Sequence, residues 1–413
     1  MRRTASRWIL VFFLLLLDYY IFTALNSVLR YEHAVTSIVF PAMFATLSVL
    51  TIACLLLFPA LQSDVRYRNL RNYLFAIAIG FLLGKLVTAA FILLDDLRRG
   101  AGWVLNQLGG NDVLTAERSS ILIWLGAGLG AVLFLSLLYG FSNKYNYRIR
   151  HVLLKYPNLP AGFRGFRFVQ ISDVHSGSFQ NKQRVRRGIE LILKEKPEAI
   201  FFTGDLVNDR AVEMNDYTDV FSELNAPLGV YSVLGNHDYG DYYWGINPQG
   251  EQALEKARNL DRLKKLEEEM GWRLLMNEHV VLERNGDQIA LIGIENWGAK
   301  AGFPKYGRMA QAYRGTEKYP FKILMSHDPS HWEAEVKVKY RDIDLTLSGH
   351  THGMQFGVEL PFLKWSPVQW VYKQWAGLYE SGHQKLYVNR GFGFLGYPGR
   401  VGILPEITVF ELQ

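Results

Sequence analysis

Histidine, aspartate and asparagine residues gather in short motifs along the second half of the chain. "DVH" occupies residues 173–175, "GD" residues 204–205 and "GNHD" residues 235–238, and "SH" at 326–327 and "GHTH" at 349–352 follow. Imidazole and carboxylate groups bind divalent transition metals, and both also transfer protons in catalysis. The motifs therefore indicate a metal-dependent site, with these candidate residues: Asp173, His175, Asp205, Asn236, His237, Asp238, His327, His350 and His352.

Each motif follows an apolar run of strand length. A cluster such as "GNHD" after one strand is an ordinary turn signal. Here five strand ends carry such clusters and hold five of the ten histidines of the chain. Ligands of open α/β sheets bind beyond the carboxyl ends of the strands, so strands that share one sheet would bring the motifs together at one edge. We predict strands at 166–171, 199–203, 229–234, 322–325, 345–347, 385–388 and 406–411, a hairpin region at 272–293, and helices at 184–194, 214–224 and 251–270.

The first third of the chain has a different composition, with apolar runs long enough to cross a bilayer, which takes about 20 residues. We predict four membrane-spanning helices, at 8–25, 37–61, 73–94 and 119–143, within a membrane region 1–143 that precedes a catalytic domain 144–413. Asp18 and Lys85 lie inside two of these spans and should face other helices. The sequence does not decide whether Asp18 and Lys85 pair with each other or have separate partners. Gly126 and Gly130 form a small-xxx-small pattern that favours close helix packing.

Basic residues flank the predicted spans unevenly. They precede the first span, lie between the second and third, and follow the fourth, as Arg2, Arg3, Arg7, Arg66, Arg68, Arg71, Lys144, Arg148 and Arg150. Because such residues favour the cytoplasmic side, we expect a multi-pass integral membrane protein with both termini and the catalytic domain in the cytoplasm. In a bacterium the membrane would be the inner one.

Overall composition excludes some classes of partner and site. The 413-residue chain has a net charge of +6 without a block of basic residues, so we expect no nucleic-acid partner. Cys54 is the only cysteine, which excludes an intrachain disulfide and a thiolate metal site. The sequence leaves the oligomeric state open.

The five motifs, in this order, resemble those of the calcineurin-like metallophosphoesterases over residues 150–413. "GLY" at 377–379, "NRGFG" at 389–393 and "PE" at 405–406 are similar to the bacterial membrane-associated branch of that superfamily. The resemblance implies an α/β sandwich with a two-metal site at the carboxyl ends of its strands. Met354 departs from the branch, which commonly has a second glycine there, but it replaces no expected ligand.

The resemblance also implies a role for each candidate residue. One ion would be held by Asp173, His175, Asp205 and His352, and the other by the bridging Asp205 with Asn236, His327 and His350. His237 would face the substrate phosphate, and Asp238 would orient His237. The resemblance thus implies two divalent ions as cofactors. Ligands without sulfur favour Mn, Fe or Zn. A water between two such ions becomes acidic enough to act as the nucleophile.

Three functions are compatible with this pattern. The first is a membrane-anchored phosphohydrolase that cleaves a phosphoester or pyrophosphate bond, with a lipid-linked phosphate as a candidate substrate and membrane lipids as partners. The second is a phosphodiesterase that acts on soluble nucleotides or diesters, with the helices only as an anchor. The third is a non-catalytic membrane sensor or transport component, which the complete ligand set argues against.

Several residues outside the motifs keep two interpretations each. The aromatic segment 361–377 suits either a membrane interface or a core loop. Arg390 suits either a phosphate contact or a salt bridge within the fold. Asp328 and His331 are expected to support the site or to lie at the surface.

Overall fold

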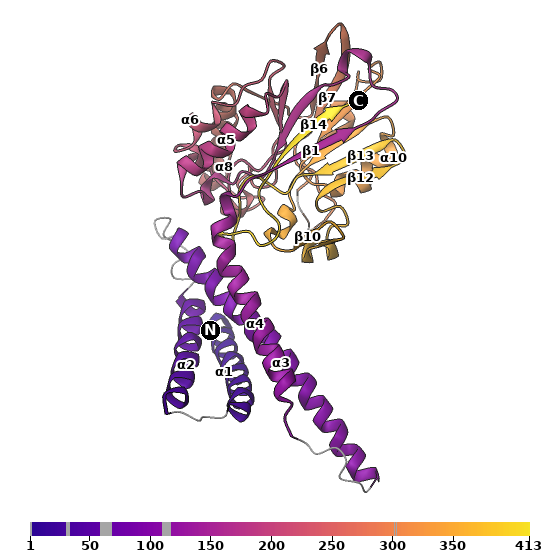
Figure 1. Cartoon of the computed structure of the whole chain (residues 1–413). Coiled ribbons are helices and arrows are strands. Elements are labelled where there is room, and N and C mark those ends of the chain that lie inside the picture. Colours follow the sequence, from indigo (N-terminus) through magenta and orange to yellow (C-terminus); the bar gives the residue numbers. More distant parts are fainter. Residues whose placement is uncertain (1, 30–33, 58–67, 110–116, 301, 303) are drawn as a thin grey trace. The chain divides into compact units, whose positions relative to one another are not determined.

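The chain folds into two compact units, Met1–Phe141 and Ser142–Gln413. The computed structural model describes residues 2–29, 34–57, 68–109, 117–300, 302 and 304–413 (Figure 1). Residues 58–61 of the second predicted span, and Arg66, lie outside the described residues. The predicted domain division at residue 143 stays a prediction.

The first unit consists of long apolar helices: α1 (Arg2–Val28), α2 (Ala34–Leu57), α3 (Arg68–Gly109) and α4 (Ser120–Gly140). Four segments within the described residues are long and apolar enough to cross a membrane: Trp8–Val28, Ile38–Leu57, Leu70–Leu108 and Ser120–Tyr145. Side chains of α1, α3 and α4, among them Ile21, Ile92 and Ile123, form a buried cluster between the helices. Most other large apolar side chains of the unit are exposed, as lipid-facing residues are.

Helix α3 is longer than the sequence predicted. The predicted span ended at residue 94, just before the charges at 95–99, but the helix continues to Gly109 and has 42 residues. These charges are tolerated because they pair along the helix, Arg98 with Asp95 at 2.9 Å and Arg99 with Asp96 at 3.1 Å. A helix of this length is about 63 Å long, whereas the bilayer core is about 30 Å thick, so part of α3 extends beyond the hydrocarbon.

Asp18 of α1 and Lys85 of α3 face each other. Lys85 Nζ lies 2.5 Å from Asp18 Oδ1, and it also donates to Ser48 Oγ at 3.3 Å. The ammonium lies over the ring of Phe81 at 4.6 Å. All three polar side chains are buried, so the two intramembrane charges are neutralised by one another inside the helix bundle.

The small-residue pattern of α4 marks a close contact with α3. A Cβ added at Gly130 would collide with the carbonyl oxygen of Gly84, and one at Gly126 with Cβ of Phe91. Neither position has room for a side chain, which is why the two backbones can approach so closely.

The second unit contains two six-stranded sheets. One has the order β1-β14-β2-β3-β4-β5, with β1 (Arg148–Leu154), β14 (Glu406–Leu412), β2 (Arg167–Ile171), β3 (Ala199–Phe202), β4 (Val230–Ser232) and β5 (Trp272–Leu274). The other has the order β12-β13-β9-β8-β7-β6, with β12 (Gly377–Ser381), β13 (Gln384–Val388), β9 (Leu345–Ser348), β8 (Lys322–Met325), β7 (Asp287–Gly293) and β6 (Glu278–Arg284). Strands β10 (Val358–Leu360) and β11 (Leu363–Trp365) form a separate hairpin.

The two sheets pack face to face, and helices cover their outer faces. Phe168 and Phe201 of one sheet share a buried cluster with Leu291, Ile323 and Leu345 of the other. The alternate residues of the first sheet pack on the opposite side beneath the helices. The helices of this unit are α5 (Lys182–Lys194), α6 (Thr218–Phe221), α7 (Asp241–Trp244), α8 (Glu251–Glu269), α9 (Met309–Tyr313) and α10 (Lys337–Lys339). The predicted α/β sandwich is thereby confirmed.

The predicted strands that carry the motifs are divided between the two sheets of the sandwich. Strands β2, β3 and β4 run parallel in one sheet, whereas β8 and β9 run parallel in the other. Their motifs still meet, because loops from the carboxyl ends of both sets of strands reach one another across the sandwich. Main-chain bonds connect the two sets: the amide of His350 after β9 donates to the carboxylate of Asp173 after β2. The predicted helix 214–224 is also shorter, with only Thr218–Phe221 as α-helix.

Candidate metal centre

The loops that carry the motif residues have unusual backbone conformations. Several non-glycine residues have positive φ angles, which cost energy and are retained where the surrounding structure fixes them. They include five candidate ligands: Asp173 (52°), His175 (48°), Asp205 (62°), His350 (71°) and His352 (50°). Such strain concentrated in one set of loops is typical of a functional site.

Two glycines allow these loops to approach each other. A Cβ at Gly235 would collide with Oδ1 of Asp205, and a Cβ at Gly349 would collide with Oγ of Ser172. Neither glycine has a positive φ angle, so the requirement is space rather than backbone conformation.

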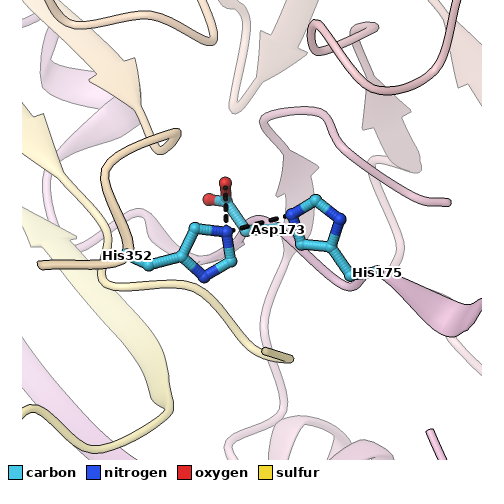
Figure 2. A group of neighbouring side chains, drawn as sticks. All are labelled: Asp173, His175 and His352. Atoms are coloured by element: carbon cyan, nitrogen blue, oxygen red, sulfur yellow. Dashed lines mark hydrogen bonds and ion pairs between the residues drawn. The ribbon is translucent and has the colours of Figure 1, made fainter. Parts of the chain in front are cut away.

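One cluster of ligand atoms consists of Asp173, His175 and His352, all buried. Figure 2 shows the two imidazole rings and the carboxylate turned toward one another. The Nε2 atoms of His175 and His352 lie 3.0 Å apart, and Nε2 of His352 lies 3.3 Å from Oδ1 of Asp173. Three groups that all offer lone pairs converge on one point, as metal ligands do.

A second cluster consists of Asp205, His327 and His350. Nε2 of His327 lies 3.1 Å from Oδ2 of Asp205 and 3.3 Å from Nδ1 of His350. The side-chain oxygen of Asn236 is 2.7 Å from the same Nδ1 atom. Asn236 thus adds a neutral oxygen to this cluster.

Asp205 lies between the two clusters. Its Oδ2 atom is 3.1 Å from Nε2 of His327 and 3.6 Å from Nε2 of His175, which belongs to the other cluster. Its Oδ1 atom accepts a hydrogen bond from the amide of His237 at 2.8 Å. The carboxylate is therefore held where one oxygen reaches both clusters.

Burial keeps two of the candidate histidine ligands in the neutral form that binds metals. It lowers the pKa of His175 to about 3 and that of His352 well below its usual value, so both imidazoles are neutral at neutral pH. Burial alone would raise the pKa of Asp205, but the charges of His327 and His237 outweigh it and hold the pKa well below the usual range. The central carboxylate is thus ionised.

The orienting role predicted for Asp238 stays a prediction, and the structure shows other partners for this residue. Its carboxylate accepts main-chain hydrogen bonds at 2.8–3.2 Å, and no bond to His237 occurs among the described residues. The donors are the amides of Asp205, Leu206, Val207 and Gly235. Asp238 therefore ties the "GD" loop to the "GNHD" loop.

His237 is oriented by other groups. Its Nδ1 atom donates to the carbonyl of Asn208 at 2.6 Å, and its ring stacks on Tyr242 with centroids 4.3 Å apart. Tyr242 Oη also accepts from Nδ2 of Asn236 at 3.0 Å. Sequence patterns gave no signal for Asn208 or Tyr242, because both lie outside the five motifs.

His350 is fixed from its far side by Tyr372 and Asp328. Nε2 of His350 lies 2.8 Å from Tyr372 Oη, which in turn donates to Oδ2 of Asp328 at 3.3 Å. The other carboxylate oxygen of Asp328 accepts from the amide of Ser330. Tyr372 and Asp328 are both buried, so the chain of bonds is sheltered from solvent. Of the two interpretations of Asp328, a support of the site and a surface residue, the structure agrees with the first.

The structure also places the other residues for which the sequence allowed two interpretations. Arg390 is buried and pairs with Glu406 and Glu359, each at 2.5 Å, so the salt-bridge interpretation is correct. His331 is buried and lies 3.0 Å from Ser326 Oγ and 3.2 Å from Glu335. The segment 361–377 combines both predicted features, since Phe362 and Trp370 are exposed whereas Trp375 and Ala376 are buried.

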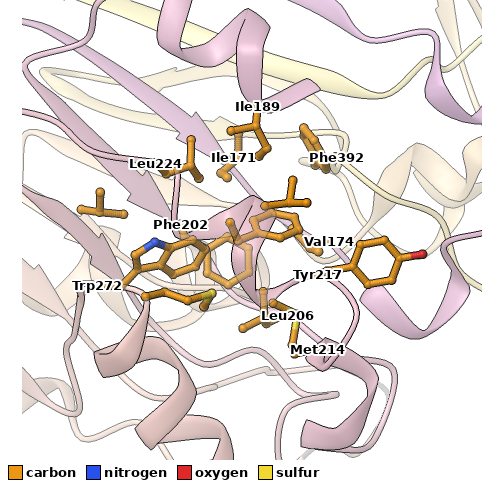
Figure 3. Packing of buried hydrophobic residues seen from close by; sticks show 14 of the residues in the cluster. Ile171, Val174, Ile189, Phe202, Leu206, Met214, Tyr217, Leu224, Trp272 and Phe392 are labelled. Atoms are coloured by element: carbon orange, nitrogen blue, oxygen red, sulfur yellow. The ribbon is translucent and has the colours of Figure 1, made fainter. Parts of the chain in front are cut away.

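The core under the first sheet anchors the ligand loops (Figure 3). Val174 lies between two candidate ligands, Leu206 follows Asp205, and both side chains are fully buried in this cluster. Phe392 of the "NRGFG" motif packs in the same cluster and stacks on Tyr147 with centroids 4.4 Å apart. Apolar side chains next to the ligands therefore hold the loops in place.

Comparison with known proteins agrees with this geometry. Residues 166–354 match the family of calcineurin-like phosphoesterases, and residues 2–144 match a family described as probable calcineurin-like phosphoesterase, transmembrane domain. Metallophosphoesterase YkuE of Bacillus subtilis (strain 168), described as uncharacterized, is 32% identical over 262 residues, which are 62% of this chain and 82% of the relative. The chain belongs to the calcineurin-like metallophosphoesterases.

Two further relatives share the catalytic unit of this metallophosphoesterase. Phosphodiesterase YaeI of Escherichia coli (strain K12) is 27% identical over 266 residues, which cover 64% of this chain and 87% of the relative. A transmembrane protein with metallophosphoesterase domain of Danio rerio is 28% identical over 262 residues, or 62% and 55% of the two chains. The chain is a metal-dependent hydrolase of phosphoric ester bonds and an integral membrane protein.

Proposed function

We propose that this metallophosphoesterase holds two divalent ions, one at Asp173, His175 and His352 and the other at Asn236, His327 and His350, with Asp205 shared. The observation that carries the proposal is the position of Oδ2 of Asp205, 3.6 Å from one cluster and 3.1 Å from the other. The donor set fits Mn, Fe or Zn, because it contains imidazole, carboxylate and amide groups without sulfur. Two such ions supply Lewis acidity and an activated water for attack on phosphorus.

His237 provides the proton for the leaving oxygen in this proposal. Because Nδ1 donates to the carbonyl of Asn208, the protonated ring presents its Nε2–H to the substrate side. Its partial exposure supports access to a bound phosphate. Asp238 acts indirectly, since it holds the loop from which Asp205 and His237 project.

The substrate we propose is a phosphoester or pyrophosphate carried by a membrane lipid. The support is that a catalytic unit and four membrane-spanning segments belong to one chain, so a substrate in the same bilayer is held near the enzyme. Soluble nucleotides or diesters are the second candidate. We place the catalytic unit in the cytoplasm, and in a bacterium the membrane is the inner one, because basic residues flank the predicted cytoplasmic ends of the spans.

The first test is metal content and hydrolysis on the same purified sample. We expect about two transition-metal ions per chain and turnover of bis-(p-nitrophenyl) phosphate. Asp205→Asn removes the shared carboxylate charge and should lower both the metal content and kcat, the latter by at least about a hundred-fold. Asp209→Asn, which changes an aspartate just beyond the ligand loop, is the matched control. Full activity of the Asp205 variant would refute the proposal.

A second assay separates the substrate classes. A lipid-linked phosphate presented in Triton micelles is compared with the soluble diester at equal concentration. A higher kcat/KM in micelles supports the lipid-linked substrate. A higher value for the soluble diester supports the anchored phosphodiesterase.

A further inference from the structure

The hairpin β10–β11 and the turn after it carry a group of exposed apolar side chains. We call this group the apolar patch and define it as Val358, Leu360, Phe362, Leu363, Trp370 and Val371. Phe362 is 86% exposed and Trp370 73%. The exposure of Phe362 exceeds that of Ile121, which at 78% is a lipid-facing residue of a membrane helix. A large aromatic side chain with so little protein contact points to a partner.

Exposed apolar residues are concentrated in this part of the catalytic unit. Among the described residues from 142 onward, 16 large apolar side chains are exposed, and half of them lie between Met354 and Leu378. The remaining ones are spread over the rest of the unit. Scattered exposed apolar residues are ordinary, whereas such a concentration is not.

The apolar patch rests on an ordered platform. Leu360 pairs with Leu363 in the hairpin, so Phe362 projects from a tight turn. The chain then forms a 3-10 helix at Pro367–Trp370, which Ser366 caps through its side chain. Beneath these elements Tyr372, Trp375, Ala376 and Ile403 form a small buried cluster. The outward direction of the patch is therefore a property of the fold.

Basic residues border the apolar patch. Lys300 Nζ donates to the carbonyl of Val371 at 2.6 Å, and Lys364 lies over the ring of Trp375 at 4.8 Å. Lys373 is exposed two residues beyond Val371. The nearby carboxylate of Glu359 is neutralised by Arg150 at 2.6 Å and Arg390 at 2.5 Å. Apolar rings with an excess of cations at their edge match a surface of anionic lipid headgroups.

We propose that the apolar patch docks on a bilayer surface that contains anionic phospholipid. The chain is an integral membrane protein, so this surface is always within reach. Exposed Met354 lies two residues after the candidate ligand His352. Tyr372, which is the next residue after Val371 of the apolar patch, contacts the candidate ligand His350. The docked patch therefore brings the mouth of the metal centre to the headgroups. Docking itself requires no hydrolysis, so it is tested independently of the proposed function.

The test measures the surroundings of residue 362 in the full-length protein. Cys54→Ser removes the only cysteine, Phe362→Cys introduces a site for a nitroxide label, and the protein is placed in nanodiscs of phosphatidylcholine with phosphatidylglycerol. Val338→Cys is the control, since Val338 is 60% exposed but lies on α10, outside the apolar patch. We expect the ratio of oxygen to nickel-chelate accessibility to be several-fold higher at 362 than at 338.

Other outcomes overturn the proposal. Equal access of the nickel chelate at both positions would show that the apolar patch faces water. Dipolar broadening at 362 would show that it contacts a second copy of the chain.

A second variant and a second lipid composition test whether the lipid contact at residue 362 depends on Trp370 and on anionic phospholipid. Trp370→Ser in the labelled protein should raise nickel access at 362, and so should nanodiscs of phosphatidylcholine alone. Hydrolysis of the soluble diester should stay unchanged, because Trp370 contacts no candidate ligand among the described residues. If the diester is not hydrolysed by any form while 362 remains in lipid, the proposed function fails and the docking surface stands.

Discussion

At the scale of single residues, the candidate ligands are held by groups on the side away from the candidate metal centre. Nδ1 of His327 donates to the carbonyl of Thr203 at 2.7 Å, which leaves Nε2 for a metal. His350 has the reverse arrangement, with Nδ1 toward the centre and Nε2 toward Tyr372. Such outer partners fix the tautomer and orientation of ligating imidazoles.

Tyr372 should therefore act as a positioning residue. Tyr372→Phe keeps the ring but removes the oxygen that Nε2 of His350 faces, so one of the two ions should bind about ten- to a hundred-fold more weakly. Metal titration by calorimetry measures this directly. Tyr313→Phe is the matched control, since it also loses a bond to an aspartate, Asp342 at 2.6 Å, and neither residue belongs to the five motifs. Equal affinities of the variant and the wild-type protein would contradict the role.

The candidate ligands stand out in the sequence, but most of the groups that support them do not. Asp173, His175 and Asp205 stand in short motifs directly after strands, so residue type and position both identify them. Asn208, Tyr242 and Tyr372 act through contacts that form only in the folded chain. The main-chain partners of Asp238 were not predicted either, because they lie in the "GD" loop and at Gly235, and sequence adjacency to His237 gives no signal for them.

At the scale of elements, the contact between α3 and α4 depends on residues without side chains. Gly130→Ala places a methyl group against the carbonyl oxygen of Gly84 and should destabilise the protein by about 1–3 kcal/mol. Gly128→Ala is an exact chemical match on the same helix, and nothing lies within 4 Å of its added Cβ. Thermal unfolding in detergent should separate the two variants, and equal midpoints would disprove close packing at Gly130.

Helix α8 brings a carboxyl group into the core. Burial raises the pKa of Glu267 to about 8, and its bond with Ser232 only partly opposes this. The folded state then binds the proton more tightly than the unfolded state. Between the usual pKa of 4.5 and a value of about 8, stability should fall as pH rises, by up to about 1.4 kcal/mol per pH unit.

Glu267→Gln should remove this pH dependence. The amide stays neutral and can still bond with Ser232, so the variant should be more stable than the wild-type protein near pH 8 and similar near pH 5. Melting temperatures measured across this range provide the test. Glu268→Gln on the exposed side of the same helix should leave the pH profile unchanged. A wild-type profile that is flat across this range would show that Glu267 is ionised in the fold.

Strand positions were predicted well because buried strands appear in the sequence as short runs of apolar residues. The run at Lys322–Met325 matches its prediction in full. Strand β1 was missed, because its residues Arg148, Arg150 and His151 make it look polar. The sandwich followed from the family resemblance, but the assignment of each strand to one of the two sheets was not predicted, since strand pairing leaves no local pattern in the sequence.

At the scale of the whole molecule, two compact units should respond differently to loss of metal. Ligands of the native state stabilise it by about 2.7 kcal/mol at a concentration of one hundred times Kd. EDTA should therefore lower the unfolding temperature of the catalytic unit by roughly 5 to 10 °C. Unfolding of the helical unit, followed by far-UV circular dichroism, should not change. A single transition insensitive to EDTA would contradict metal binding.

The pairing of β1 with β14 has a consequence for biosynthesis. The first strand of the catalytic unit lies parallel to the last, in register from Arg148 with Glu406 to Leu154 with Leu412. At a translation rate of about 5–20 residues per second, roughly 13 to 50 seconds separate the synthesis of the two strands. During this interval the membrane helices are already made, while β2 still lacks its neighbour β14. A ribosome that stops early therefore leaves a membrane-inserted chain with an open sheet edge, which chaperones and proteases can recognise before any complete hydrolase exists.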